Sequence, residues 1–305
     1  MDKSKKIEEQ GSYGAGLCLK NGVEAIARGE EGDFKLKINY LDGDGDDELY
    51  EEVIKILFDE IPEIGDYSWE LNIKMSLPVS QGFGMSGAGA VAAASSFQRA
   101  LGIAHEESRR RSYLVAHKVE RIRSTGLGDI TALSAGGVER RVAIGSPYSG
   151  EKLNSGPGKA EGWFEEMQLI LAWKSKIGKH TSSYIDNLDW KEKITSSGRK
   201  AMKTIIEGTW DRSRWQELIE SAEKFVIDSE LIMDSKRNEL LFESNNLIKD
   251  CGLEEYVVSL LCMLGKSIVI VPKNLDLNNF ETDKILDKFN EAGFETILTN
   301  LSNNS

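Results

Sequence analysis

The sequence predicts a two-domain α+β fold, and three observations support this prediction. The chain has 305 residues, about twice the length that one domain commonly takes. Segments with apolar residues at every second position alternate with segments of helical periodicity, which indicates sheets covered by helices. The stretch from Gly145 to Gly162 is rich in glycine and contains two prolines, which is typical of a connection between domains. We therefore expect one domain over residues 1–155 and a second over residues 156–305.

The first half is expected to contain five strands and four helices before the connection. Trp69 to Leu77 carries apolar residues at every second position, the pattern of a half-buried strand. The acidic turn from Asp42 to Glu48 is expected to cap a helix rather than bind calcium, because Asp47 stands where a calcium loop needs glycine. The other expected strands lie near residues 17–19, 23–27 and 34–38, and the other expected helices begin near residues 87, 106 and 129.

The second half is expected to alternate strands and helices. A strand near Ala135 to Ile144 closes the first half, and a strand from Met167 to Trp173 opens the second. Helices are expected between residues 182 and 246. The tail is then predicted as helix, strand, helix and strand over residues 253–264, 266–271, 282–292 and 295–299, half of an α/β sandwich.

Charge and composition exclude several classes of protein. Fifty acidic against 38 basic side chains give a net charge of −12, which disfavours a nucleic-acid or anionic-membrane binder. No apolar run approaches the roughly 20 residues of a membrane-spanning helix. The first six residues lack the apolar core of a signal peptide, and three scattered cysteines do not suggest a disulfide framework. We therefore expect a cytoplasmic protein that binds neither nucleic acid nor membrane.

The most informative stretch runs from Pro78 to Ala90, where a strand ends, glycines follow and an alanine-rich helix begins. Backbone N–H groups at such a helix start bind anions, and the Ser86 hydroxyl could contact a phosphate or its Mg²⁺. Gly82 to Gly87 match the dinucleotide-binding pattern, but the second strand with a terminal acidic residue that a Rossmann site needs does not follow. A P-loop is also disfavoured, because no Gly-Lys-Ser/Thr follows the glycines. A glycine turn that merely allows close packing stays an alternative.

This stretch resembles the second motif of the GHMP-type small-molecule kinases, which include galactokinase, homoserine kinase, mevalonate kinase and phosphomevalonate kinase. The family pattern Pro-x-x-x-Gly-Leu-Gly-Ser-Ser-x-Ala is matched at Pro78, Gly82, Gly84, Ser86 and Ala88. The segment Gly-Phe-Gly-Met-Ser-Gly-Ala-Gly-Ala resembles the archaeal pantoate kinase branch more than the other branches of the family. Further matching blocks occur at Gly11–Gly16, Ala116–Glu120, Thr125–Asp129, Gly136–Gly137, Ser259 and Cys262–Gly265.

The resemblance implies a fold, two cofactors and a set of site residues. The N-terminal half would resemble the second domain of ribosomal protein S5, the C-terminal half would be a ferredoxin-like α/β sandwich, and the active site would lie in the cleft between them. ATP and Mg²⁺ would be the cofactors, with Ser86 and Glu120 reaching the metal. Asp129 would orient or deprotonate the attacking hydroxyl. The residues implied in nucleotide binding are Pro78, Gly82, Phe83, Gly84, Met85, Ser86, Gly87, Ala88 and Gly89. Candidates on the acceptor side are Gly14, Arg123, Lys179 and Thr181.

Alternatives stay open for these roles and for the substrate. Glu120 could be a solvated carboxylate paired with Arg123, and Asp129 could be a plain helix N-cap. The acceptor implied is pantoate, and mevalonate 3-phosphate is the alternative acceptor. A second alternative for the function is a non-catalytic relative that binds a nucleotide or metabolite. Residues 1–10 lack the Pro-Gly motif with which the family normally opens, so we expect either a truncated start or a rebuilt acceptor site. A homodimer is compatible with the sequence.

Overall fold

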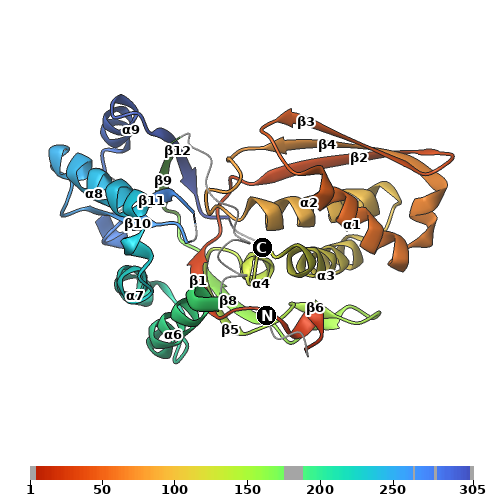
Figure 1. Ribbon diagram of the computed structural model, residues 1–305, viewed down its shortest axis with the longest axis horizontal. Coiled ribbons are helices and arrows are strands. Elements are labelled where there is room, and N and C mark those ends of the chain that lie inside the picture. The colour runs from red at the N-terminus through yellow and green to blue at the C-terminus, as the bar shows by residue number, and fades with distance from the viewer. Residues whose placement is uncertain (1–4, 175–187, 264, 278–279, 303–305) are drawn as a thin grey trace.

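The structure is a computed structural model that describes residues 5–174, 188–263, 265–277 and 280–302. Its N-terminal half has three layers (Figure 1). The first layer is a sheet of β2 (Val23–Glu31), β4 (Tyr67–Met75) and β3 (Lys35–Asp42), in which central β4 pairs antiparallel with β2 and parallel with β3. Helices α1 (Asp47–Glu60), α2 (Met85–Ala100) and α3 (His105–Arg123) form the second layer.

The main core lies between this sheet and its helices. Trp69, Leu71 and Ile73 occupy every second position of β4, and each is buried against apolar residues of α1, α2 and α3. This is the half-buried strand that the alternation predicts. The Asp46 side chain accepts a hydrogen bond from the Glu48 N–H, so the acidic turn caps α1 as expected.

The third layer consists of short strands beneath α3 and α4 (Asp129–Ala135). β5 (Val138–Ala143) pairs antiparallel with both β1 (Gly14–Leu17) and β8 (Lys159–Trp163). The hairpin of β6 (Tyr148–Ser149) and β7 (Asn154–Ser155) lies between β5 and β8 in the chain. β8 lies past residue 155 and still pairs with β5, so this sheet continues beyond the predicted boundary, and the division into two domains stays a prediction.

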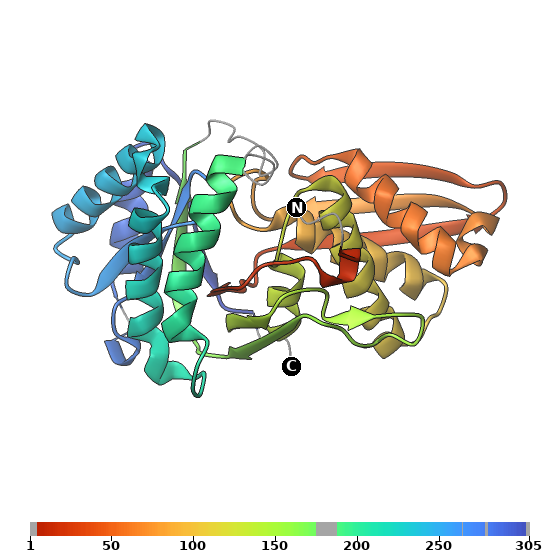
Figure 2. The ribbon, with the colours of Figure 1, turned by 60° about the horizontal axis from the view of Figure 1, so that its bottom comes forward.

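The C-terminal half is built on a four-stranded antiparallel sheet of order β10-β11-β9-β12. Its chain order, one strand, helices, two strands, one helix and a final strand, is the ferredoxin-like arrangement that we expected. The strands are β9 (Gln168–Trp173), β10 (Val257–Leu261), β11 (Ser267–Pro272) and β12 (Glu295–Asn300). The helices are α6 (Leu188–Ile205), α7 (Trp215–Asp228), α8 (Ser235–Asp250) and α9 (Thr282–Glu291). Figure 2 shows α6 and α7 side by side.

Short 3₁₀ turns complete the described chain: η1 (Ile7–Glu9), η2 (Pro62–Asp66), η3 (Arg212–Arg214), η4 (Leu231–Met233) and η5 (Leu275–Leu277). The η1 turn is held against the N-terminal half. The Ile7 carbonyl lies 3.1 Å from His117 Nε2, and the Glu8 carbonyl accepts a 2.7 Å bond from the Ser146 N–H. Within the described ranges, the chain contains no helix whose length and hydropathy would let it span a bilayer.

The helix predicted over residues 253–264 is wrong, because the structure has the strand β10 there. Gly252 adopts a positive φ of 67° and turns the chain after α8. Val257 and Val258 are β-branched, which favours a strand, and β10 pairs with β11 from Val257 to Leu261. The other elements predicted in this tail are confirmed.

Besides the covalent chain, backbone hydrogen bonds join the two halves. Past β12, the Ser302 N–H donates to the Cys18 carbonyl at 2.7 Å, and the Gly137 N–H donates to the Ser302 carbonyl at 3.0 Å. Leu19 and Leu301 also form an antiparallel bridge. The last described residues of the C-terminal half therefore extend the small sheet that contains β1 and β5.

Truncating Ile73 to alanine tests the core. Ile73 is fully buried, so Ile73→Ala should lower the free energy of unfolding by about 2–5 kcal/mol, measured by urea denaturation. The control is Ile26→Ala on neighbouring β2, where Ile26 is 57% exposed and the change should be within about 0.5 kcal/mol. Equal losses at both positions would contradict the assigned faces of the sheet.

Candidate active site

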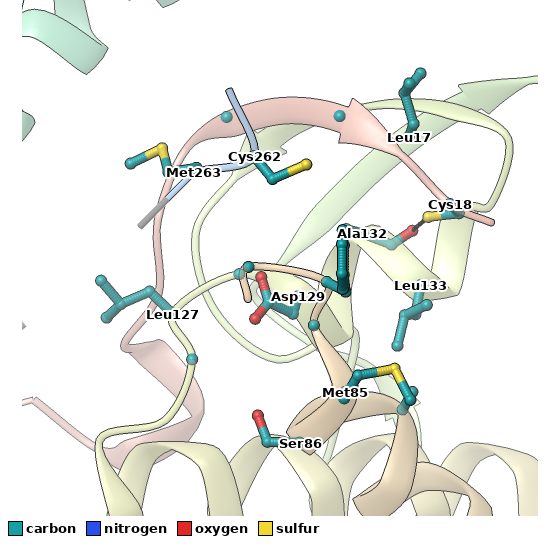
Figure 3. A pocket seen from close by; sticks show the side chains of 18 of the residues that line it. Leu17, Cys18, Met85, Ser86, Leu127, Asp129, Ala132, Leu133, Cys262 and Met263 are labelled. Atoms are coloured by element: carbon teal, nitrogen blue, oxygen red, sulfur yellow. Dashed lines mark hydrogen bonds between the residues drawn. The ribbon is translucent and has the colours of Figure 1, made fainter. Parts of the chain in front are cut away.

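A cavity of about 2170 Å³ lies between the two halves and is lined by residues of both. Its walls include β1, the stretch from Leu77 to Ser86, the loop from Thr125 to Asp129, faces of α6 and α7, and residues 260–263. Figure 3 shows Ser86 and Asp129 at this pocket together with Cys262 and Met263 of the C-terminal half. The cleft expected between the halves is therefore present.

The glycine loop, residues 78–84, provides a backbone anion site at the start of α2. Gly82 and Gly84 have φ angles of +89° and +68°, which side chains beyond glycine rarely adopt. Gly84 is the N-cap of α2, and glycine has no side chain with which to cap the N–H groups of the first turn. These N–H groups and the positive end of the helix dipole can bind phosphate oxygens.

The conformation of this loop depends on a turn of the C-terminal half. The Ser267 hydroxyl donates to the Gln81 carbonyl, and a Cβ on Gly265 would lie 1.8 Å from that same oxygen. The buried Arg237 of α8 donates from Nε to the Gly265 carbonyl at 3.0 Å. Backbone therefore packs on backbone here, and only glycine fits at position 265.

Ser86 and Glu120, the two residues predicted to reach the metal, are joined by a hydrogen bond. The Ser86 hydroxyl donates to Glu120 Oε1 at 2.7 Å, and the Thr125 hydroxyl donates to the same oxygen at 3.2 Å. Glu120 is buried, and burial, reinforced by the charge of Asp129, raises its pKa to about 8. A cation placed beside this carboxylate would lower that pKa again.

Glu120 and Asp129 converge on Gly126. A Cβ on Gly126 would lie 2.0 Å from Glu120 Oε2 and 2.8 Å from Asp129 Oδ2, so the two carboxylates leave space for glycine alone. Burial raises the pKa of Asp129, whereas the charges of Arg141 and Arg121 lower it. The Arg121 guanidinium also donates to the Gly126 carbonyl and holds this turn.

The residues present fit a magnesium ion that is held mainly by phosphates. Mg²⁺ prefers oxygen ligands and is commonly bound by one or two carboxylates together with phosphate and water. Ser86 and Glu120 offer a hydroxyl and a carboxylate beside the anion site. In the part of the chain that the structure describes, no group of three or more His, Cys, Asp and Glu side chains could hold a metal on its own.

Two cavity residues, Glu139 and Arg141, were missed by the sequence reasoning. They occupy alternate positions of β5 and face the cavity, and Arg141 Nε lies 3.6 Å from Glu139 Oε2. Arg140 between them points to the opposite face, where it pairs with Glu161 at 2.7 Å. The available signal was a pair of opposite charges at alternate positions of an otherwise buried strand.

The candidates predicted on the acceptor side lie in different places. Gly14 lines the cavity, and a Cβ there would lie 2.0 Å from Arg141 Nη2. Arg123 pairs instead with Asp46 at 2.6 Å and with Glu48 at 3.1 Å, and it is absent from the described lining of the cavity. Lys179 and Thr181 lie outside the described residues.

The residues predicted to bind nucleotide form one continuous segment. Those that line the cavity are Pro78, Gly82, Phe83, Gly84, Met85, Ser86 and Ala88. Gly87 and Gly89 instead face neighbouring elements, since a Cβ on Gly87 would meet Ile130 at 3.2 Å and one on Gly89 would meet the Tyr50 hydroxyl at 2.8 Å. Their assignment to nucleotide binding stays a prediction.

Cys18 also lines the cavity, and its thiol donates to the Ala132 carbonyl at 3.5 Å (Figure 3). Burial raises the pKa of this thiol to about 12. Cys18 is therefore protonated at neutral pH and does not supply a nucleophile.

Replacing Gly265 with alanine tests the contact that shapes the glycine loop. The added methyl group would overlap the Gln81 carbonyl, so Gly265→Ala should displace the loop and weaken ATP binding at least about tenfold by calorimetry. Gly22→Ala is the control, because Gly22 also lines the cavity but a Cβ there meets nothing within 4 Å. Unchanged ATP affinity in Gly265→Ala would show that the loop does not depend on this contact.

The buried carboxyl of Glu139 predicts a pH dependence of stability. Burial raises its pKa from the ordinary 4.5 to about 7, with Arg141 opposing the shift and Asp129 adding to it. The folded protein then keeps a proton that the unfolded chain releases, so the free energy of unfolding should fall between pH 4.5 and 7. Urea denaturation of Glu139→Gln should lack this part of the fall, up to about 3 kcal/mol. Parallel profiles of the two proteins would contradict the burial of an ionisable group here.

Comparison with known proteins agrees with this geometry. Residues 48–137 match the family model of the GHMP kinases N terminal domain. The pantoate kinase of Thermococcus kodakarensis is 26% identical over 199 residues, which cover 65% of this chain and 62% of that protein. The pantoate kinase of Methanospirillum hungatei is 32% identical over 135 residues, 44% of this chain and 45% of that protein. The alignments thus span less than two thirds of either relative.

Solved structures with the same fold cover nearly the whole chain. A phosphotransferase related to the CoA biosynthesis pathway has a TM-score of 0.72 at 21% identity and covers 97% of this chain and 89% of its own. Streptococcus pneumoniae phosphomevalonate kinase with phosphomevalonate and AMPPNP has a TM-score of 0.65 at 12% identity, with 97% and 95% covered. Residues 48–137 are thus similar to the GHMP kinases N terminal domain, and the chain has the two-half α+β fold of these solved kinases.

Proposed function

We propose that this chain is an ATP-dependent kinase that phosphorylates the primary alcohol of a small hydroxy acid. We further propose that the acceptor is pantoate, which would become 4-phosphopantoate in the biosynthesis of coenzyme A. One observation carries the proposal: Ser86 and Asp129 line one cavity at the N-terminus of α2, and the buried Glu120 lies directly behind them, bonded to Ser86 and close to Asp129 across Gly126. The two pantoate kinases among the relatives support the choice of acceptor.

The donor end of the cavity would be the glycine loop and the first turn of α2. The backbone N–H groups there suit the phosphates of ATP, and Ser86 and Glu120 would hold Mg²⁺. When bound, Mg²⁺ neutralises the negative charge of the transferring phosphoryl group. The hydrogen bond from Ser86 orients the Glu120 carboxylate before the nucleotide arrives.

Asp129 would orient the attacking hydroxyl and accept its hydrogen bond. Asp129 is partly buried, and a carboxylate with a raised pKa is a stronger base than a fully exposed one, while Arg141 and Arg121 keep its ionised form accessible. Glycines at positions 126 and 128 keep the approach to Asp129 free of side chains, since a Cβ on either would clash with neighbouring polar groups.

Arg141 would bind the carboxylate of the acceptor. Its guanidinium lines the cavity and its charge acts on Asp129, which supports a role at the acceptor end. A guanidinium recognises a carboxylate through paired hydrogen bonds. Arg141 can thus pair with the single carboxylate of pantoate.

Two alternatives remain to be separated by experiment. Mevalonate 3-phosphate is the other acceptor that the sequence suggested, and a non-catalytic relative would keep the nucleotide site alone. The hydrogen bond between Ser86 and Glu120 and the convergence of Glu120 with Asp129 favour catalysis over binding alone. Donor and acceptor ends belong to one chain, so the mechanism does not require the homodimer that the sequence allows.

The proposal is tested by ADP release with ATP, Mg²⁺ and three acceptors in parallel: pantoate, mevalonate and mevalonate 3-phosphate. Pantoate should give the highest kcat/KM. Asp129→Asn should lower kcat at least about 100-fold while ATP binding is kept, because the hydroxyl loses its acceptor. Asp234→Asn is the control, since Asp234 caps α8 and asparagine caps a helix equally well.

Other outcomes would redirect the assignment. If the wild type gives its highest kcat/KM with mevalonate 3-phosphate, that compound replaces pantoate as the proposed acceptor. ATP binding without ADP release on any of the three acceptors would support the binding-protein alternative. Near-normal turnover of Asp129→Asn would reduce Asp129 to a helix cap.

A further inference from the structure

We propose that Glu139 determines acceptor specificity, by accepting a hydrogen bond at Oε2 from a second, unmodified hydroxyl group next to the acceptor's carboxylate. This inference rests on the proposed function and adds a recognition group to it. The acceptor class that it selects is a dihydroxy acid, in which one hydroxyl is phosphorylated and the other is read by the protein.

The first argument is the state of the Glu139 carboxylate. Glu139 is only 2% exposed, yet it lines the cavity. Its Oε2 atom has no hydrogen-bond partner in the described part of the chain. An unpartnered carboxylate oxygen at such a depth is unfavourable, and buried polar atoms of native proteins are nearly always satisfied. A donor that enters the cavity would satisfy it.

The second argument is the distance to Arg141. Arg141 Nε lies 3.6 Å from Glu139 Oε2, which is an ion pair without a hydrogen bond, and this Nε also has no partner among the described residues. Two unsatisfied polar atoms of opposite kind thus lie side by side at the cavity. An α-hydroxy acid presents the complementary pair, with its carboxylate as acceptor and its adjacent hydroxyl as donor.

The third argument is the space that β1 leaves beside both side chains. A Cβ on Gly14 would lie 2.0 Å from Arg141 Nη2, and a Cβ on Gly16 would lie 3.2 Å from Glu139 Oε1. Both glycines line the cavity and pair with β5. Their missing side chains allow Glu139 and Arg141 to lie against the strand and keep the acceptor end open.

Asp129 completes a three-point pattern. The negative charge of Asp129 raises the pKa of Glu139, and the positive charge of Arg141 lowers the pKa of Asp129. The three groups therefore form one cluster at the acceptor end. Asp129 would take the primary hydroxyl, Arg141 the carboxylate and Glu139 the secondary hydroxyl. A phosphate in place of that secondary hydroxyl would meet the Glu139 charge in a water-poor site, where like charges repel strongly.

The test compares pantoate with its analogue that lacks the secondary hydroxyl, 4-hydroxy-3,3-dimethylbutanoate. The wild type should prefer pantoate by about 10- to 100-fold in kcat/KM, because the analogue leaves Glu139 unpaired. In Glu139→Ala the preference should fall to about twofold or less. The loss should occur with pantoate, while the analogue is processed almost as well as by the wild type.

Two further variants separate recognition from stability. Glu139→Gln keeps a hydrogen-bond acceptor without the charge, so it should retain part of the preference and should accept mevalonate 3-phosphate better than the wild type does. It also serves if Glu139→Ala does not fold. Glu161→Ala is the matched control on β8, because Glu161 pairs with Arg140 on the opposite face and should leave the preference unchanged.

The outcomes distinguish this inference from the proposed function. If the wild type phosphorylates pantoate and the analogue equally well, or if Glu139→Ala slows both by the same factor, the inference is overturned and the proposed function stands. If the wild type phosphorylates no hydroxy acid, the proposed function fails and the inference falls with it.

Discussion

The contact of Gly265 with the glycine loop is the constraint on which the rest of the site depends. The loop carries the backbone groups that would bind phosphate, and it is held from outside as well as by its own glycines. A turn of the C-terminal half does so, through the Gly265 backbone, the Ser267 hydroxyl and the buried Arg237 of α8. A site in the N-terminal half thus requires the folded C-terminal half, although the family model matches only residues 48–137.

Burial of charge gives the site its chemistry. Glu120 and Glu139 are buried and Asp129 is partly buried, and loss of water raises the pKa of each carboxyl group. Such a cluster is unfavourable by itself and is balanced here by Arg121 and Arg141. A cation at Glu120 and a donor at Glu139 would complete the balance, so ligands and protein would stabilise one another.

Most of the fold could be predicted because its elements are marked by local patterns, such as the alternation in β4 and the glycines before α2. The helix predicted over residues 253–264 failed because the pairing of β10 with β11 is a tertiary effect that an apolar run does not reveal. Arg141 and Glu139 were missed because they lie beside Gly14 and Gly16 of β1, which are distant from them in the sequence. Arg123 was an unsuitable candidate because the acidic turn before α1 binds it.

The return of the chain to the small sheet has a further consequence. Ser302 bonds to Cys18 and Gly137, while Gly265 contacts Gln81 at a separate place, so two independent attachments join the halves. A rigid rotation of one half against the other would break at least one of them. The position of each half against the other is therefore fixed at separate places when the chain folds, and the cavity between the halves has walls that are already in place before a ligand enters.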